Sequence, residues 1–422
     1  MTKVGILWAN ESLGLYGNAP FDHLYRGIGR NNGNLAFVYA IVNQIREKLT
    51  YIPWQFEPKQ IADVDVIVIP CANQFGKHTD LGKLAGLLER ADKPVVAIGL
   101  GAQAKNMESE VEVTLGTLEW LRVLNSHRPG SASNIYTRGP YTVTQLARFG
   151  VEDAVAGGCP SHFINENADL GHRIHKNWTS IGLPRAISVA AGHERWANVR
   201  SVEHRLIAMM QDPVHPGQYV VQSMSDMIKI SRGEFDTIDP EVLAQIHAYT
   251  VPHYTLDEFK SWCRAYARSF YDIPSWMDSL RRYDLTIGPR YHGVALAMQA
   301  ERMGLTVAID SRTEEMCVQT GIPHVRVEEF TKRPITRASL KTMIKFSPVV
   351  YDRQRSERAR NYVAFLKANG LTPAPHLEKI AVRPKPPAAP SPALVPALVP
   401  ALGADRAPIA AAMTQPADGE TV

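Results

Sequence analysis

The sequence predicts an α/β protein built from two doubly wound, Rossmann-like domains that face a cleft. Short apolar runs alternate with amphipathic stretches, which is the pattern of parallel sheets covered by helices. The pattern restarts after a polar, irregular segment at Asn167–Arg185, where we expect the domain boundary. A chain of 422 residues is long enough for two or three domains that each bury a core.

Residues 1–170 are expected to form the N-terminal domain. Its strands are expected at Lys3–Trp8, Val64–Pro70, Val95–Leu100 and Ser133–Thr137, and its helices at Asn34–Leu49, Leu81–Ala91 and Pro140–Phe149. The runs at 66–69 and 95–98 are continuously apolar, which is typical of strands that are buried on both faces.

Residues 171–375 are expected to form the C-terminal domain. Its strands are expected at Ala186–Ala191, Tyr219–Gln222, Leu285–Ile287 and Leu305–Ile309. Its helices are expected at Val202–Met210, Leu256–Ser269, Ile273–Arg282, Val294–Met303 and Tyr351–Asn369, the last of which can cross back to the first domain. Two such domains place a cleft between the carboxyl ends of both sheets.

Composition changes near residue 381. Half of residues 381–422 are Pro or Ala, and the segment has no helical or strand period. Because proline removes backbone hydrogen-bond donors, we expect a disordered tail here, and docking of the tail to a partner is the less favoured alternative.

Charge and cysteine content exclude several classes of protein. A net charge of +4 is too small to indicate a nucleic-acid-binding surface. The four cysteines, Cys71, Cys159, Cys263 and Cys317, stand singly without metal-ligand spacing, so we expect reduced thiols and no metal site, with Cys159 a buried, inert thiol. No signal peptide or membrane-spanning segment is recognisable, and the expected location is the cytoplasm.

The segment Asp284–Ala300 carries the clearest chemical signal. A strand ends in Gly288-Pro289, and Arg290, Tyr291, His292 and Gly293 then open a helix. A helix N-terminus, a guanidinium and an imidazole favour an anion such as phosphate with a general acid beside it. The alternative is a structural turn in which the histidine caps the helix and the arginine pairs with a surface acid.

Other segments at strand ends supply further candidates for the cleft. Arg138 leaves the Ser133–Thr137 strand, and His162 follows two glycines, although a solvent-facing histidine in a turn is equally expected there. Arg195 and Trp196 follow the Ala186–Ala191 strand and could hold an anion and a sugar face. Weaker candidates are Gly33 and Asn34, at a glycine-rich helix entry, and Gln103, after the Val95–Leu100 strand.

These motifs resemble the polysaccharide pyruvyl transferase family. The resemblance rests on TRGPYTVTQLARFGV and GGCPSHF in the first half, and on GPRYHGVALAMQA followed by Asp310-Ser311-Arg312 in the second. It implies a two-domain fold similar to that of GT-B glycosyltransferases, with the donor bound by the C-terminal domain. It also implies an enzyme that uses phosphoenolpyruvate to attach pyruvate ketals to sugars, without a metal or other cofactor.

By this resemblance, His292 would be the proton donor and Arg290 an anion anchor, assisted by Tyr291, Gly293 and a second arginine, Arg195. The acceptor would be a cell-surface or exopolysaccharide precursor, which could be lipid-linked and so draw the enzyme to the inner face of the membrane. Two alternatives stay open: a glycosyltransferase that uses a nucleotide sugar, and a non-catalytic saccharide-binding protein on the same fold.

Overall fold

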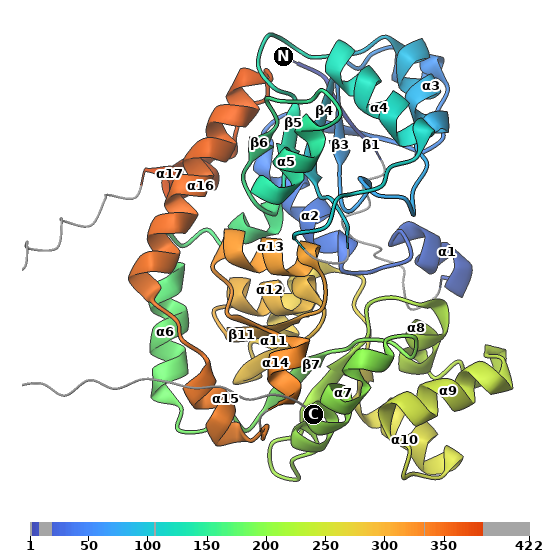
Figure 1. Ribbon diagram of the computed structural model, residues 1–422, viewed down its shortest axis with the longest axis vertical. Coiled ribbons are helices and arrows are strands. Elements are labelled where there is room, and N and C mark those ends of the chain that lie inside the picture. Colours follow the sequence, from blue (N-terminus) through green and yellow to red (C-terminus); the bar gives the residue numbers. More distant parts are fainter. Residues whose placement is uncertain (1, 8–18, 105–106, 333, 383–422) are drawn as a thin grey trace, which may run out of the picture. The chain divides into compact units, whose positions relative to one another are not determined.

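The computed structural model describes residues 2–7, 19–104, 107–332 and 334–382, and these residues form two parallel six-stranded sheets (Figure 1). The predicted tail at 381–422 therefore lies almost wholly outside the described residues. The first sheet has the order β2-β1-β3-β4-β5-β6 and the second the order β12-β11-β10-β7-β8-β9. The predicted fold class, two doubly wound α/β units, is confirmed.

The strands of the first sheet are β1 Val4–Leu7, β2 Leu49–Ile52, β3 Val66–Pro70, β4 Val95–Leu100, β5 Ile135–Thr137 and β6 Val155–Ala156. Those of the second sheet are β7 Ile187–Ala190, β8 Gln218–Val220, β9 Ala267–Arg268, β10 Leu285–Gly288, β11 Met303–Ala308 and β12 His324–Arg326. Central strands β3, β4, β7, β10 and β11 are buried along their whole length, which explains their continuous apolar sequence.

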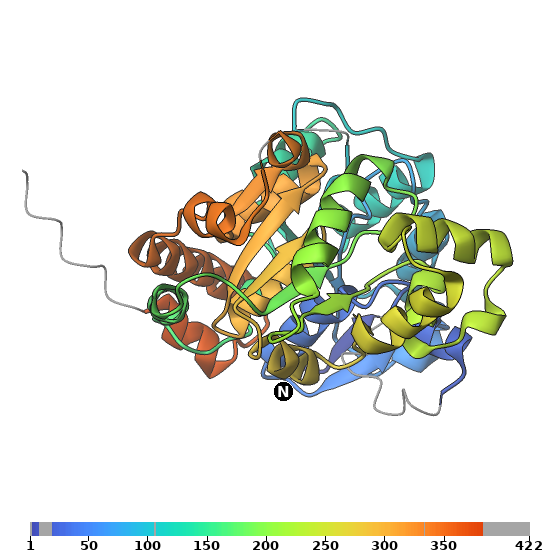
Figure 2. The same cartoon turned by 90° about the horizontal axis from the view of Figure 1, so that it is seen from below.

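Helices connect the strands of each sheet, and they cover both faces of the second one (Figure 2). In the first half they are α1 Phe21–Gly27, α2 Asn34–Gln44, α3 Gly82–Ala91, α4 Leu115–Ser126, α5 Pro140–Ala147 and α6 Leu170–Ser180. In the second half they are α7 Arg200–Met210, α8 Ser225–Arg232, α9 Pro240–Thr250, α10 Leu256–Tyr266, α11 Ile273–Leu280, α12 Tyr291–Gln299, α13 Ser311–Thr320, α14 Val327–Thr331, α15 Arg337–Met343, α16 Pro348–Ala368 and α17 Pro375–Ala381. None of the described helices is long and apolar enough to cross a bilayer.

Several sequence-based expectations about elements were wrong. The expected helices at Leu256–Ser269 and Val294–Met303 end at Tyr266 and Gln299, because strands β9 and β11 follow. The expected helix at Asn34–Leu49 ends at Gln44, because Leu49 already belongs to edge strand β2. The segment Asn167–Arg185 is not irregular, because it contains α6, whose buried stripe of Leu170, Ile174 and Trp178 follows a four-residue period. The boundary proposed between residues 170 and 171 stays a prediction.

Helix α16 contacts parts of the chain that are far apart in sequence. It lies beside α6 (Figure 1). Its Tyr362 and Phe365 rings pack against Tyr136 of β5, at centroid distances of 4.8 and 5.2 Å. Helix α17 follows and packs on α16, with its last residue, Ala381, buried. The C-terminal part of the described chain is thus attached to the first sheet.

Candidate active site

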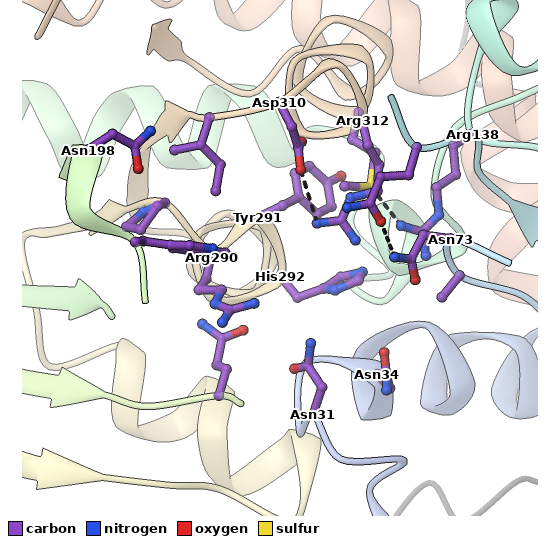
Figure 3. Close-up of a pocket in the computed structure, with 17 residues that line it drawn as sticks. Asn31, Asn34, Asn73, Arg138, Asn198, Arg290, Tyr291, His292, Asp310 and Arg312 are labelled. Atoms are coloured by element: carbon purple, nitrogen blue, oxygen red, sulfur yellow. Dashed lines mark hydrogen bonds and ion pairs between the residues drawn. The ribbon is translucent and has the colours of Figure 1, made fainter. Parts of the chain in front are cut away.

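A cavity of about 440 Å³ lies where the carboxyl ends of strands from both sheets meet (Figure 3). From the second sheet it receives residues that follow β7, β8, β10 and β11, and from the first sheet residues that follow β3, β4 and β5. Strands β7 and β10 are neighbours in the sheet, although their connections run to opposite sides. Such a switch point is where open α/β sheets bind ligands.

Arg290 and Arg312 line this cavity, and each has a hydrogen-bond donor that no described residue uses. The Arg290 guanidinium stacks over the Trp196 ring, 4.2 Å from its centroid, and donates a hydrogen bond to Ser223. Arg312 lies 3.7 Å from the Asp310 carboxylate (Figure 3). The Nε atoms of both arginines are buried and have no hydrogen-bond partner among the described residues. Buried donors of this kind are normally satisfied, so they point to an acceptor that a ligand would bring.

Arg138, the third arginine of the cavity, is fixed by the backbone of the first sheet. It follows β5 directly, is 1% exposed, and donates from Nε to the Gly99 carbonyl at 2.9 Å. Its guanidinium also contacts the Cys71 carbonyl and Met316 Sδ, and lies over the Phe37 ring. These contacts hold one positive charge rigidly at the wall of the cavity.

Burial and mutual repulsion act on the pKa values of these arginines without neutralising them. Burial, with a smaller effect of Arg312, lowers the pKa of Arg290 to about 10. Burial likewise lowers the pKa of Arg138. A guanidinium with a pKa near 10 is still a cation at neutral pH. Among the lining residues that the structure describes, only Asp310 offers an opposite charge. The cavity is therefore cationic.

His292 is the second residue of α12 and lines the same cavity. Its Nε2 lies 3.5 Å from Sγ of Cys159, which also accepts a hydrogen bond from Ser161 Oγ, and its ring packs against Phe37. Burial, followed by repulsion from Arg138 and Arg312, lowers the pKa of His292 well below its usual value. The protein alone thus keeps this imidazole neutral at pH 7, and a polyanion beside it would raise the pKa.

Comparison with known proteins decides the family. A profile described as polysaccharide pyruvyl transferase matches residues 18–311, which is more than half of the chain. The chain belongs to the polysaccharide pyruvyl transferase family. The matched region contains both Arg290 and His292, and this family is one of enzymes.

Solved structures to which the chain is similar are distant in sequence. The S. aureus MnaA–UDP co-structure is 7% identical, with a TM-score of 0.45, covering 89% of this chain and 99% of that one. A Methanocaldococcus jannaschii UDP-GlcNAc 2-epimerase in complex with UDP-GlcNAc and UDP is 9% identical, with a TM-score of 0.41 and coverage of 82% and 94%. Acinetobacter baumannii MurG is 10% identical, with a TM-score of 0.34 and coverage of 90% and 98%. A search of curated proteins returns no match.

Most residues that were expected in the cleft from the sequence line the cavity. They are Asn34, Gln103, Arg138, Trp196, Arg290, Tyr291 and His292. Gly33 and Gly293 lie behind the lining, where an added Cβ would come within 2.9 Å of Gln222 Oε1 and 2.7 Å of Gln222 Nε2. Both glycines therefore allow α2 and α12 to approach the Gln222 side chain closely.

Two assigned residues lie elsewhere. The Arg195 side chain is 72% exposed and does not line the cavity, because the turn after β7 directs Trp196 inward and packs it against His193. Arg312 occupies the cavity instead. His162 is 3% exposed and packs between Phe163 and Tyr351, so it is an interior residue rather than a cleft residue. Burial and the nearby Arg355 lower the pKa of His162 well below its usual value.

Several residues of the site had no separate role predicted from the sequence. Asn31, Asn73, Gln222, Asp310 and Arg312 line the cavity. Arg312 and Gln222 follow strands β11 and β8. Arg290 was selected because it follows a strand, and the same criterion would also have selected these two residues. Cys159 is buried as expected, but it has a basic neighbour in space, His292, which is 133 residues away in sequence. No local pattern reveals that pair.

A buried carboxyl group near the cavity was also not predicted from the sequence. Glu203 of α7 is fully buried, where it accepts hydrogen bonds from the Tyr219 hydroxyl at 2.6 Å and the Gly192 amide at 3.0 Å. Burial raises the pKa of Glu203 to about 7. In the part of the chain that is described, no group of three or more His, Cys, Asp and Glu side chains has the geometry of a metal site.

Proposed function

We propose that this enzyme transfers pyruvate from phosphoenolpyruvate to a saccharide acceptor, where it becomes a ketal, and releases phosphate. The observation that carries the proposal is the set of three guanidinium groups in one cavity, two of which have buried Nε donors with no partner in the described part of the chain. Phosphoenolpyruvate has a phosphate and a carboxylate on a three-carbon unit, and guanidinium groups bind both kinds of anion in bidentate fashion. Leaving a buried donor unpaired costs about 1–3 kcal/mol, which a bound anion would recover.

The reaction begins with addition of an acceptor hydroxyl across the double bond. The hydroxyl oxygen forms a bond to C2 and loses its proton, while C3 gains a proton and becomes a methyl carbon. The adduct then expels phosphate by cleavage of its bond to C2. A second hydroxyl of the same acceptor attacks C2 and closes the ketal, and its proton leaves with the phosphate.

In this proposal His292 supplies the proton to C3. The low pKa of His292 reflects burial and the two guanidinium groups nearby, Arg138 and Arg312. A phosphate and a carboxylate bound by the same arginines would cancel that repulsion and raise the pKa of the imidazole toward neutrality. The negative charge of the bound donor would therefore allow His292 to act as a general acid. The arginines would stabilise the negative charge that the departing phosphate carries.

Phosphate release tests this function. The purified protein is incubated with phosphoenolpyruvate and a panel of oligosaccharides, sugar phosphates and nucleotide sugars, with EDTA present, and products are identified by mass spectrometry. The expected result is acceptor-dependent phosphate release with gain of a pyruvate ketal, which His292→Gln reduces about a hundredfold or more. Release of nucleoside diphosphate from a nucleotide sugar without phosphoenolpyruvate would instead identify a glycosyltransferase.

A matched substitution controls for non-specific loss of charge. Arg90 lies on the exposed surface of α3 and lines none of the cavities described here. Arg290→Gln should raise the KM for phosphoenolpyruvate, whereas Arg90→Gln should leave it unchanged. Binding of saccharides with no turnover of phosphoenolpyruvate by any acceptor would mean that the chain is a binding protein, and the proposal would fail.

A further inference from the structure

A second cavity, of about 620 Å³, opens beside the first and belongs to the N-terminal half of the chain. The two cavities share Asn31, Asn34, Ala72 and Asn73 in their linings. A molecule in the second cavity would therefore contact a molecule in the first cavity, the proposed donor site, at the edge formed by these shared residues. Its volume is within the range of about 300–1,000 Å³ that is typical of small-molecule sites.

The described residues that line the second cavity carry positive charge and no negative charge. Arg26, in the last turn of α1, and Arg30, just after that helix, both contribute exposed side chains to its lining. Neither guanidinium has an ion-pair or hydrogen-bond partner among the described residues, and no Asp or Glu belongs to the described lining. His78 adds no charge at pH 7, because burial lowers the pKa of this imidazole. The two arginines thus set the charge that this cavity would select.

The backbone around Arg30 is held in an uncommon conformation. Gly29 and Arg30 have φ angles of 59° and 61°, and the left-handed region is unfavourable for a residue that carries a Cβ. The Arg30 amide donates to the Tyr25 carbonyl at 2.8 Å, and the Asn34 side-chain amide donates to the Gly29 carbonyl at 3.2 Å. These bonds fix the turn that carries Arg30 to the cavity.

The remaining walls offer apolar faces and amides. Trp54 is partly buried and Phe37 forms part of the same lining, while Asn31, Asn73 and Gln74 add amide groups that can donate and accept hydrogen bonds. Aromatic rings pack on the apolar face of a sugar, and amides bond to its hydroxyls. A neutral saccharide would use these groups but would leave both arginines unpaired.

We infer that the second cavity is the acceptor site and that it takes an anionic saccharide, with the negative group held by Arg26 and Arg30 and a sugar ring near Trp54. The inference rests on the proposed function, since it names the class of acceptor for the same reaction. The shared edge between the cavities would bring two sugar hydroxyls toward the donor. A sugar phosphate, a nucleoside diphosphate sugar and a uronic acid all supply the required charge.

Equilibrium binding by calorimetry tests the inference without relying on turnover. The ligands are a hexose 1-phosphate, a UDP-hexose, a methyl hexuronide and a neutral methyl hexoside, with phosphoenolpyruvate as the donor-site probe. The variants are Arg26→Gln combined with Arg30→Gln for the second cavity, Arg312→Gln for the first, and Arg90→Gln as the exposed control. The first three ligands separate the possible sources of the anionic group.

A crossed pattern is expected. At least one anionic sugar should bind more tightly than the neutral hexoside, and the double variant should weaken it about tenfold or more, as loss of charged hydrogen bonds does. The affinity for phosphoenolpyruvate should be unchanged in the double variant and reduced in Arg312→Gln. The affinity for the anionic sugar should be unchanged in Arg312→Gln. Arg90→Gln should change neither.

Three outcomes would overturn the inference. The neutral hexoside could bind as tightly as every anionic sugar, the anionic sugar could respond to Arg312→Gln instead of the double variant, or none of the sugars could bind to a protein that binds phosphoenolpyruvate. The proposed function fails separately, if phosphoenolpyruvate itself does not bind or is not turned over with any acceptor.

Discussion

At the scale of single residues, the imidazole of His292 is held by groups that the sequence places far away. Cys159 Sγ lies 3.5 Å from Nε2, and Phe37 packs against the ring. The sulfur engages one ring nitrogen, which leaves the other ring nitrogen as the atom that can exchange a proton with a ligand. In the proposed mechanism Cys159 would thus position His292 and need not react itself.

Removal of this sulfur should impair turnover more than binding. We expect Cys159→Ala to lower kcat roughly tenfold, as a small misplacement of a reacting group does, with little change in the KM for phosphoenolpyruvate. Cys159→Ser should retain more activity, because it keeps a polar atom beside Nε2. Steady-state kinetics across pH 6–9 measures both.

Cys263 provides the matched control for loss of a buried thiol. It is fully buried in α10 and does not line either of the two ligand cavities described here. If Cys159→Ala and Cys263→Ala have the same kcat and the same pH profile, the contact between Cys159 and His292 has no role in catalysis.

At this scale, the sequence places a residue near the cavity where that residue closely follows a buried strand. Arg290, His292 and Arg138 lie just beyond the ends of β10 and β5, so the position of the strand fixes where they lie. The sequence did not reveal the positions of Arg195 and His162, because a turn of several residues decides which side chain points inward. Trp196 lines the cavity, whereas the side chain of its neighbour, Arg195, is exposed.

At the scale of elements, α16 is tied to the segment that links the two sheets. The Arg355 side chain is fully buried and donates to the carbonyls of His162 at 3.0 Å and Asn167 at 2.7 Å, and also to Asn165. Three backbone carbonyls of residues 162–167 therefore depend on one side chain. Without it, these buried acceptors would lack a partner.

Substitution of Arg355 should therefore destabilise the fold. We expect Arg355→Met to lower the free energy of unfolding by roughly 2–4 kcal/mol, since several charged hydrogen bonds are lost together. Arg353 is exposed on the same helix, and Arg353→Met should change stability little. Urea denaturation followed by circular dichroism measures both, and equal midpoints for the two variants would refute the role of Arg355.

Central elements were predictable from sequence, whereas edge elements were not. Strand β4 was expected at its observed bounds, because a strand buried on both faces is apolar throughout. Strands β6 and β9 have two residues each, and β2 and β12 are exposed edges, so none of them carries a clear apolar pattern. Helix α6 is polar apart from one narrow stripe, which made its segment resemble a linker.

At the scale of the whole molecule, the described packing ends with α17. This helix buries Leu377, Ile380 and Ala381 against the rest of the fold. The Ala381 carbonyl accepts hydrogen bonds from Ser356 at 3.3 Å and Arg360 at 3.0 Å. The change of composition near residue 381 therefore comes at the end of this helix, and the helix itself was not predicted.

Two truncations test this boundary. A chain that ends after Val382 should keep the thermal midpoint and phosphate-release rate of the full chain, because residues 383–422 have the composition of a segment without a core. A chain that ends after Ala374 loses the buried face of α17, and its midpoint should fall by several degrees. Equal stability of the two truncated chains, or loss of activity in the longer one, would contradict this assignment.

If the cationic cavity binds phosphoenolpyruvate, the bound anion should raise the pKa of His292 so that the imidazole becomes protonated. At pH 7 the pKa of His292 lies below the ambient pH before binding, and a neighbouring anion raises it, so binding should take up a proton from solvent. Calorimetric titration of phosphoenolpyruvate in buffers with different ionisation enthalpies measures that uptake. The wild-type protein should take up close to one more proton than His292→Gln, which should still bind the ligand. Equal proton uptake by the two proteins, or no binding by the wild type, would contradict it.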